Sequence, residues 1–160
     1  MSFTYKKASI DDIDFLTDVR IEVLKSANQL SDDVDMSDVR KETYRYYQNN
    51  LENENHCAYL VFFGEEFVGA GAVSFFEVMP TYHNPSGKKA YIMNMYTKPN
   101  YRRRGSAYKL LDILVNEARN KKINAITLEA TSVGRPLYEK YGFISMKDEM
   151  ELPTNIRVNL

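Results

Sequence analysis

The sequence predicts a single α/β domain, residues 1–160, whose sheet has a strand–helix–strand unit at its centre. Three observations lead to this prediction. Segments rich in β-formers alternate with segments of helical period, two β-rich segments near the middle are spaced as a hairpin, and no repeat or flexible linker divides the chain. The expected order is strand, two helices, three strands, helix, strand, short helix and two final strands.

The first third of the chain is predicted to form one strand and two helices. Residues 3–7 are extended, and Ser9 followed by Asp12 gives a capping-box pattern that starts a helix. A second helix is expected at residues 37–51, where three tyrosines either pack in the core or line a cleft. The apolar stripe of the first helix, which runs to about Ala27, consists of Ile13, Leu16, Val19, Val23 and Leu24, and the tyrosines of the second are Tyr44, Tyr46 and Tyr47.

The other elements follow from β-former content, turn residues and helical spacing. Gly64 lies in the turn between two antiparallel strands, residues 79–89 form a loop with two prolines and a glycine, and Gly142 stops a short helix. The predicted strands are residues 57–63, 67–78, 90–97, 123–130, 143–147 and 149–152, and the predicted helices are residues 106–122 and 136–141.

Composition and charge argue against several function classes. Lys and Arg number 21 against 22 Asp and Glu, so the chain lacks the positive excess that binding nucleic acid usually needs. The longest mainly apolar stretch, residues 57–63, is far shorter than the roughly 20 residues that cross a bilayer. Cys57, the single cysteine, is expected to be a buried apolar residue and not a nucleophile. With a polar N-terminal segment, we expect a cytoplasmic protein without nucleic-acid or membrane partners.

Three consecutive arginines precede a glycine and two small residues at the start of a predicted helix. A helix N-terminus offers free N–H groups and the positive end of its dipole to an anion. Glycine lets the backbone approach a ligand closely, and arginines add charge-assisted hydrogen bonds to phosphate. Nucleic acid or a solvated turn are the alternatives, but the context favours a diphosphate. The predicted ligand-binding residues are Arg102, Arg103, Arg104, Gly105, Ser106 and Ala107.

This loop and a second segment resemble the GNAT superfamily of acyl-CoA-dependent N-acetyltransferases. Residues 102–107 match its main motif: Gln or Arg, two residues, Gly, one residue, Gly or Ala. Residues 137–143 match the Leu-Tyr-Glu-Lys-x-Gly-Phe half of a second motif, but Thr131 replaces the usual Asn and Gly134 the usual Ala. The resemblance is good over residues 90–143. It implies a GNAT-like mixed, mostly antiparallel sheet with a central parallel β-α-β unit and helices on both faces.

The resemblance also implies a reaction. The chain would transfer an acetyl group from acetyl-CoA, without a metal, to a primary amine of a small molecule or peptide by direct attack through a tetrahedral intermediate. The alternative is a non-catalytic acyl-CoA-binding sensor. Tyr138 matches the family's general acid, and a homodimer is possible, with the tail at residues 146–160 as its interface. The further cofactor-binding residues would be Met95, Tyr96, Thr97, Thr131 and Arg135.

The acceptor side is less constrained by the sequence. An acidic segment before the second helix either attracts a cationic amine or simply caps that helix. No single general base is identified among Glu77, His83 and Glu129, which with Tyr82 are the candidate substrate-binding residues. Aromatic residues either line an acceptor pocket or belong to the core: Tyr44, Tyr47, Phe76 and Tyr82.

Overall fold

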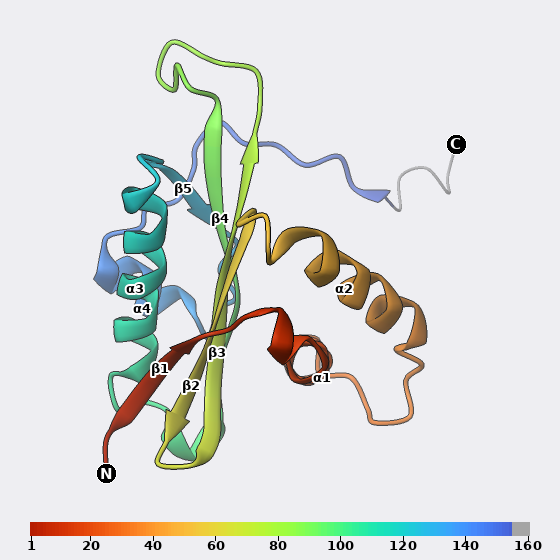
Figure 1. The fold of residues 1–160 in the computed structure, drawn as a ribbon. Coiled ribbons are helices and arrows are strands. Elements are labelled where there is room, and N and C mark those ends of the chain that lie inside the picture. Colours follow the sequence, from red (N-terminus) through yellow and green to blue (C-terminus); the bar gives the residue numbers. More distant parts are fainter. Residues whose placement is uncertain (155–160) are drawn as a thin grey trace. The chain divides into compact units, whose positions relative to one another are not determined.

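A computed structural model describes residues 1–154 of the chain, which divides into two compact units. The first unit is Met1–Glu129 and the second begins at Ala130. Each unit is described on its own below (Figure 1).

The first unit contains a five-stranded sheet and three α-helices. The strand order is β1-β2-β3-β4-β5; neighbours from β1 to β4 are antiparallel, and β4 and β5 are parallel. This confirms the predicted mixed, mostly antiparallel sheet with one β-α-β unit. The strands are β1 Phe3–Lys7, β2 His56–Phe63, β3 Glu66–Glu77, β4 Lys88–Thr97 and β5 Ala125–Leu128, and the helices are α1 Ile13–Ala27, α2 Ser37–Asn50 and α3 Ser106–Asn120.

The predicted capping box is present before α1. The Asp12 carboxylate accepts a hydrogen bond from the Ser9 N–H at 2.9 Å, and the Ser9 hydroxyl accepts one from the Asp11 N–H at 3.3 Å. These bonds start a short 3₁₀ turn, Ile10–Asp12, which continues directly into α1. The local signal was therefore correct, since its polar groups satisfy N–H groups that a helix start leaves unpaired.

Helices cover both faces of the sheet in this unit (Figure 1). On one face, the apolar stripe of α1 and Tyr47 of α2 form a core with Leu60 and Ala72 of the sheet. On the other face, α3 packs closely: a Cβ on Gly71 would lie 2.8 Å from Leu110 of this helix. Cys57 is buried and its pKa is raised to about 12, chiefly by burial, which confirms its expected role as an apolar core residue.

The end of β4 departs from the regular sheet. A register shift opposite Ala70 and Ala72 of β3 marks a bulge, and Asn94 there has the left-handed φ of 59°. The pairing of β4 with β5 ends at Ile92, whereas β4 itself continues to Thr97. The last five residues of β4 therefore run past the end of its parallel neighbour.

The second unit contains one short helix, α4, at Arg135–Tyr141. The two final strands predicted at residues 143–147 and 149–152 are wrong, because the described chain is not extended into a ladder there. Ile144 is 88% exposed and Met150 is 93% exposed. β-formers make a strand only where a neighbouring strand supplies hydrogen bonds, and none pairs with this segment among the described residues. The predicted tail interface also includes residues 155–160, which lie outside the described residues.

Candidate functional site

The arginine-rich loop ends in an open helix N-terminus. Gly105 precedes α3 with φ of 86°, a conformation that glycine adopts at no steric cost. A Cβ built on Gly105 would meet no atom within 4 Å beyond its own chain neighbours, so no other part of the protein crowds this position. The first N–H groups of an α-helix such as α3 have no acceptor within the helix, and they can bind an anion.

The arginines of the loop are exposed and are positioned by the neighbouring strand end. Arg102 donates from Nε to the Thr97 carbonyl at 3.0 Å, which ties the loop to the end of β4. The Arg104 guanidinium lies 5.1 Å from the centre of the Tyr101 ring. Ser106 is buried, and its carbonyl accepts a hydrogen bond from the Tyr5 hydroxyl at 3.3 Å. The structure thus brings together the two cofactor-binding segments predicted in this unit.

Met95, Tyr96 and Thr97 lie on β4 beyond the last residue that β5 pairs with. Their edge toward β5 carries backbone N–H and C=O groups that no strand of the described chain takes up. A helix N-terminus, exposed guanidinium groups and a strand edge with which no other strand of residues 1–154 pairs are features that suit a diphosphate followed by an amide-containing arm. The residues present therefore fit an acyl-CoA.

In the second unit, Tyr138 is half-buried on α4, with its ring 6.2 Å from that of Phe143. Burial raises the pKa of its hydroxyl, so Tyr138 holds its proton at neutral pH. Gly134 lies against this ring: a Cβ there would be 3.0 Å from Cε2 of Tyr138. The Thr131 hydroxyl accepts a hydrogen bond from the Gly134 N–H at 3.1 Å. Thr131, which replaces the usual Asn, therefore bonds to the residue before α4, and Gly134, which replaces the usual Ala, leaves room for the Tyr138 ring.

Arg135, the remaining predicted cofactor contact of this unit, is exposed at the start of α4. Its Nη1 atom lies 3.2 Å from the Ser145 hydroxyl and 3.9 Å from the Glu139 carboxylate.

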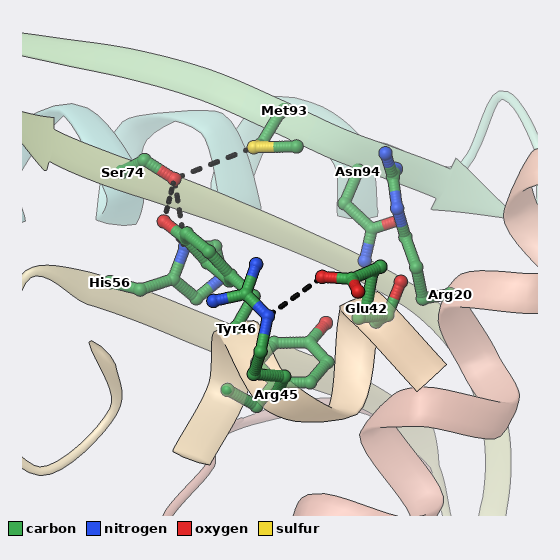
Figure 2. Close-up of a pocket in the computed structure, with 10 residues that line it drawn as sticks. Arg20, Glu42, Arg45, Tyr46, His56, Ser74, Met93 and Asn94 are labelled. Atoms are coloured by element: carbon green, nitrogen blue, oxygen red, sulfur yellow. Dashed lines mark hydrogen bonds and ion pairs between the residues drawn. The ribbon is translucent and has the colours of Figure 1, made fainter. Parts of the chain in front are cut away.

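A cavity of about 410 Å³ lies in the first unit, between α1, α2 and the sheet (Figure 2). Its volume is within the range of pockets that bind small molecules. The lining side chains come from both helices and from three neighbouring strands, β2, β3 and β4. They are Arg20, Glu42, Thr43, Arg45, Tyr46, Tyr47, His56, Ser74, Met93 and Asn94.

A hydroxyl network runs along one wall of the cavity. The Ser74 hydroxyl lies 2.8 Å from Nδ1 of His56 and 2.9 Å from the Tyr46 hydroxyl, as Figure 2 shows. His56 is buried, and Nε2 has no hydrogen-bond partner among the described residues. Its pKa is lowered to about 4, chiefly by burial and then by the charge of Arg20. His56 is therefore neutral at physiological pH, and it orients Ser74.

Arg20 brings a positive charge to the cavity from a core-facing position of α1. Its side chain is half-buried, and Nη1 donates to Oδ1 of Asn94 at 3.1 Å. Burial lowers its pKa, which shows that the guanidinium has lost solvation. Arg45, the second cation of the lining, is exposed and is paired with Glu42 at 2.7 Å.

The structure places the predicted acceptor residues unevenly. Of the two roles left open for the tyrosines of α2, Tyr46 lines the cavity, and Tyr47 both lines it and belongs to the buried core. Glu77, Tyr82, His83 and Glu129 are exposed and do not line the cavity; their part in binding an acceptor stays a prediction. Tyr44 packs against the core, and Phe76 is 45% exposed outside the cavity lining.

The acidic segment between α1 and α2 makes local hydrogen bonds. Oδ1 of Asp35 accepts from the Ser37 N–H at 2.9 Å, where α2 begins, and Ser31 donates to Asp33. These contacts favour the capping interpretation over attraction of an amine. None of the acidic residues of this segment lines the cavity: Asp32, Asp33, Asp35 and Asp38.

Sequence reasoning named only Tyr46 and Tyr47 of the ten lining residues, and four of the eight that it missed supply the buried charge and the polar contacts of the cavity. Arg20 had a usable signal, because it falls on the apolar stripe of α1, four residues after Leu16 and three before Val23. His56 had a weaker one, since it directly precedes the strand predicted at residues 57–63 and is in fact the first residue of β2. The other two of these four, Ser74 and Asn94, had none, because their place depends on the pairing of β3 with a bulged β4.

Two findings limit other kinds of site. Among residues 1–154, no group of His, Cys, Asp and Glu side chains is arranged to hold a metal ion. In the same part of the chain, every helix is too short or too polar to cross a bilayer.

Comparison with known proteins matches residues 24–143 to the model of the acetyltransferase (GNAT) family. A predicted acetyltransferase from Clostridium acetobutylicum, solved with acetyl-CoA, is 35% identical, with a TM-score of 0.86 over 97% of this chain and 98% of that one. No curated protein matches.

Two other solved structures share the fold at lower identity. A GCN5-related N-acetyltransferase from Ralstonia eutropha is 22% identical, with a TM-score of 0.82 over 96% and 99% of the two chains. An aminoglycoside acetyltransferase from an uncultured soil metagenomic sample is 19% identical, with a TM-score of 0.70 over 96% and 99%. Because the family model spans most of the sequence and the Clostridium structure is similar over nearly its whole length, the chain belongs to the GNAT acetyltransferase family.

Proposed function

We propose that this protein is an N-acetyltransferase that transfers the acetyl group of acetyl-CoA to a primary amine of a small molecule. One observation carries the proposal: the open N-terminus of α3 is tied, through Arg102 and Thr97, to a strand end that runs past its parallel neighbour. The chain that has this arrangement belongs to an acetyltransferase family, which supports the proposal.

The bound acetyl-CoA would supply an acyl group activated as a thioester. The N–H groups at the start of α3 and the guanidinium groups of Arg102, Arg103 and Arg104 would bind its diphosphate. Along residues 95–97, backbone groups would hold the arm in place. One N–H there would donate to the carbonyl oxygen as negative charge develops on it, which is the largest stabilising effect such a site offers.

Tyr138 would provide the proton that the departing thiolate needs. Its pKa is raised by burial, so the hydroxyl carries a proton at neutral pH. The amine nitrogen would first bond to the acyl carbon, and the carbon–sulfur bond would then break as the tyrosine proton passes to sulfur. The extra proton on the attacking nitrogen would return to the tyrosine oxygen, directly or through water, which leaves a neutral amide and a neutral tyrosine. The amine must arrive neutral, and this requires loss of one proton to water or to a base before attack.

The cavity beside α1 and α2 would receive the acceptor. Its volume of about 410 Å³ suits a small molecule better than a folded protein segment. Met93 and Asn94 line it and directly precede the strand residues proposed to hold the acyl group. A structural neighbour that is an aminoglycoside acetyltransferase supports a small polar acceptor.

The test is an acceptor screen on the full chain. Calorimetry should detect CoA binding, and incubation with acetyl-CoA and a panel of amines should release free thiol above the rate without amine. Absence of CoA binding would overturn the proposal. Binding with no thiol release across a broad panel would instead indicate the non-catalytic sensor.

A further inference from the structure

We propose that the cavity selects an acceptor that carries a carboxylate near its amine, and that Arg20 binds this carboxylate. This assignment rests on the proposed acetyltransferase function and narrows its acceptor to amino acids and similar small aminocarboxylates.

The argument begins with an unbalanced charge. Arg20 is half-buried, and in residues 1–154 no carboxylate lies within ion-pair distance of its guanidinium. The side-chain oxygen of Asn94, to which it donates a hydrogen bond, is neutral. A charge taken out of water is costly unless an opposite charge meets it. A guanidinium has five N–H donors, so several remain for an anion in the cavity.

The other charges of the cavity cancel. Arg45 and Glu42 pair with each other at 2.7 Å, and both are exposed at its rim. His56 is neutral, and the remaining polar groups are hydroxyls and amides. One positive charge is therefore left uncompensated. A carboxylate, with a single negative charge and two oxygens that match the planar guanidinium fork, balances it, whereas a phosphate dianion would exceed it.

The position of Arg20 also relates the carboxylate to the reacting amine. Its partner Asn94 is the residue before Met95, and consecutive Cα atoms are about 3.8 Å apart. Under the proposed function, the acyl group lies along residues 95–97. An anion held beside Asn94 therefore sits within one small molecule's length of that point. The Tyr46 and Ser74 hydroxyls on the neighbouring wall supply further polar contacts (Figure 2).

The first test needs only the natural chain. Alanine, phenylalanine and lysine would each be compared with the corresponding primary amide, by kcat/KM for thiol release from acetyl-CoA. The free acids should be used at least about 10-fold better than the amides, mainly through KM, because a hydrogen-bonded charge pair contributes at this level. Equal or better use of the amides would overturn the assignment. Comparing O-phosphoethanolamine with ethanolamine tests whether the cavity prefers a phosphate group. Higher kcat/KM for O-phosphoethanolamine than for all three amino acids would also overturn the assignment of a carboxylate.

The second test uses variants. Arg20→Gln should bring the acid-to-amide ratio close to one, and Arg20→Lys should leave an intermediate ratio, since lysine keeps the charge without the planar fork. Arg40→Gln is the matched control: Arg40 is exposed, pairs with Asp18 at 2.6 Å and does not line the cavity, so the ratio should stay as in the natural chain. An unchanged ratio in a folded Arg20→Gln protein would overturn the role of Arg20.

Failure of the two proposals would look different. Thiol release with no amine of the broad acceptor panel would overturn the acetyltransferase function and with it this assignment. Equal rates of thiol release with the acids and with the amides would leave the acetyltransferase function in place and overturn only the proposed recognition of a carboxylate.

Discussion

The loop at residues 102–107 and the cavity beside α1 are both expected to bind ligand, yet they are built in opposite ways. The loop is six consecutive residues whose backbone conformation is set locally, with Gly105 at φ of 86°. The cavity takes its polar groups from five elements, and Arg20 and Asn94 meet at 3.1 Å although 74 residues separate them. A contiguous site can be found as a motif, whereas a dispersed one exists only once the sheet has its register.

The largest effect is expected at Tyr138, which belongs to the second contiguous motif, residues 137–143. A substitution there tests whether contiguous motifs identify functional residues. Tyr138→Phe removes the proposed proton donor while keeping the ring against Phe143. We expect kcat to fall about 10²- to 10⁴-fold with little change in CoA affinity, because general acid catalysis contributes at that level. Steady-state thiol release and calorimetry measure the two quantities. Tyr141→Phe, on the same short helix, is the control. If kcat fell less than about threefold, Tyr138 would be only a packing residue.

On the dispersed side, His56 links the cavity to the stability of the fold. Its pKa is lowered to about 4 in the folded protein against an ordinary value of 6.5, so the unfolded chain binds the proton more readily. Above about pH 6.5 this histidine should have almost no effect on the free energy of unfolding. As the pH falls toward 4, the free energy of unfolding should decrease, because the unfolded chain takes up the proton first. By linkage the loss is about 2 kcal/mol at pH 5.

Urea unfolding at pH 7 and pH 5 measures this loss, and the other histidine of the chain supplies the control. His56→Asn should remove about 2 kcal/mol of the difference between the two pH values, whereas His83→Asn, in an exposed loop, should leave it intact. The same pH dependence in both variants would show that another group is responsible.

Gly105 tests whether the loop binds through its backbone. Gly105→Ala places a Cβ in open space, so nothing clashes, but the left-handed conformation becomes unfavourable by about 1–2 kcal/mol. We expect CoA affinity to fall about 10-fold, corresponding to that energy. Gly64→Ala is a matched control with φ of 62° in the β2–β3 turn, and it should leave CoA affinity unchanged. Calorimetry decides; an equal loss in both variants would exclude a specific role for the loop.

The smallest effect is expected at Gly134, where the chain departs from its family motif. Gly134→Ala restores the usual residue, but its Cβ would lie 3.0 Å from the Tyr138 ring and shift it by a few tenths of an ångström. We expect kcat to fall about threefold, because small misplacement of a reacting group lowers rate. Val133→Ala, which alters an 81% exposed neighbour, is the control. Higher activity in Gly134→Ala would show that the glycine does not serve the tyrosine.

Much of the fold was predictable because its signals are local. The capping box at Ser9 and the β-rich segments of β2 and β3 need no distant partner to be recognised. The strands predicted at residues 143–147 and 149–152 failed for the same reason, since strand formation requires a neighbour that composition does not reveal. Arg20 was within reach as a charge on an apolar stripe, but its meeting with Asn94 depends on a bulge in β4.

The strand end at residues 95–97 has a consequence for how such proteins diverge. Its contribution would come from peptide groups, which every amino acid except proline supplies in full. Replacement of side chains along this strand end would therefore leave its backbone hydrogen bonds to the acyl donor largely unchanged during evolution. The proposed acceptor cavity would have no such protection, because exchanging Arg20 or Ser74 would change which acceptor it binds. A lineage built on this plan would keep its acyl donor and change its acceptors one substitution at a time.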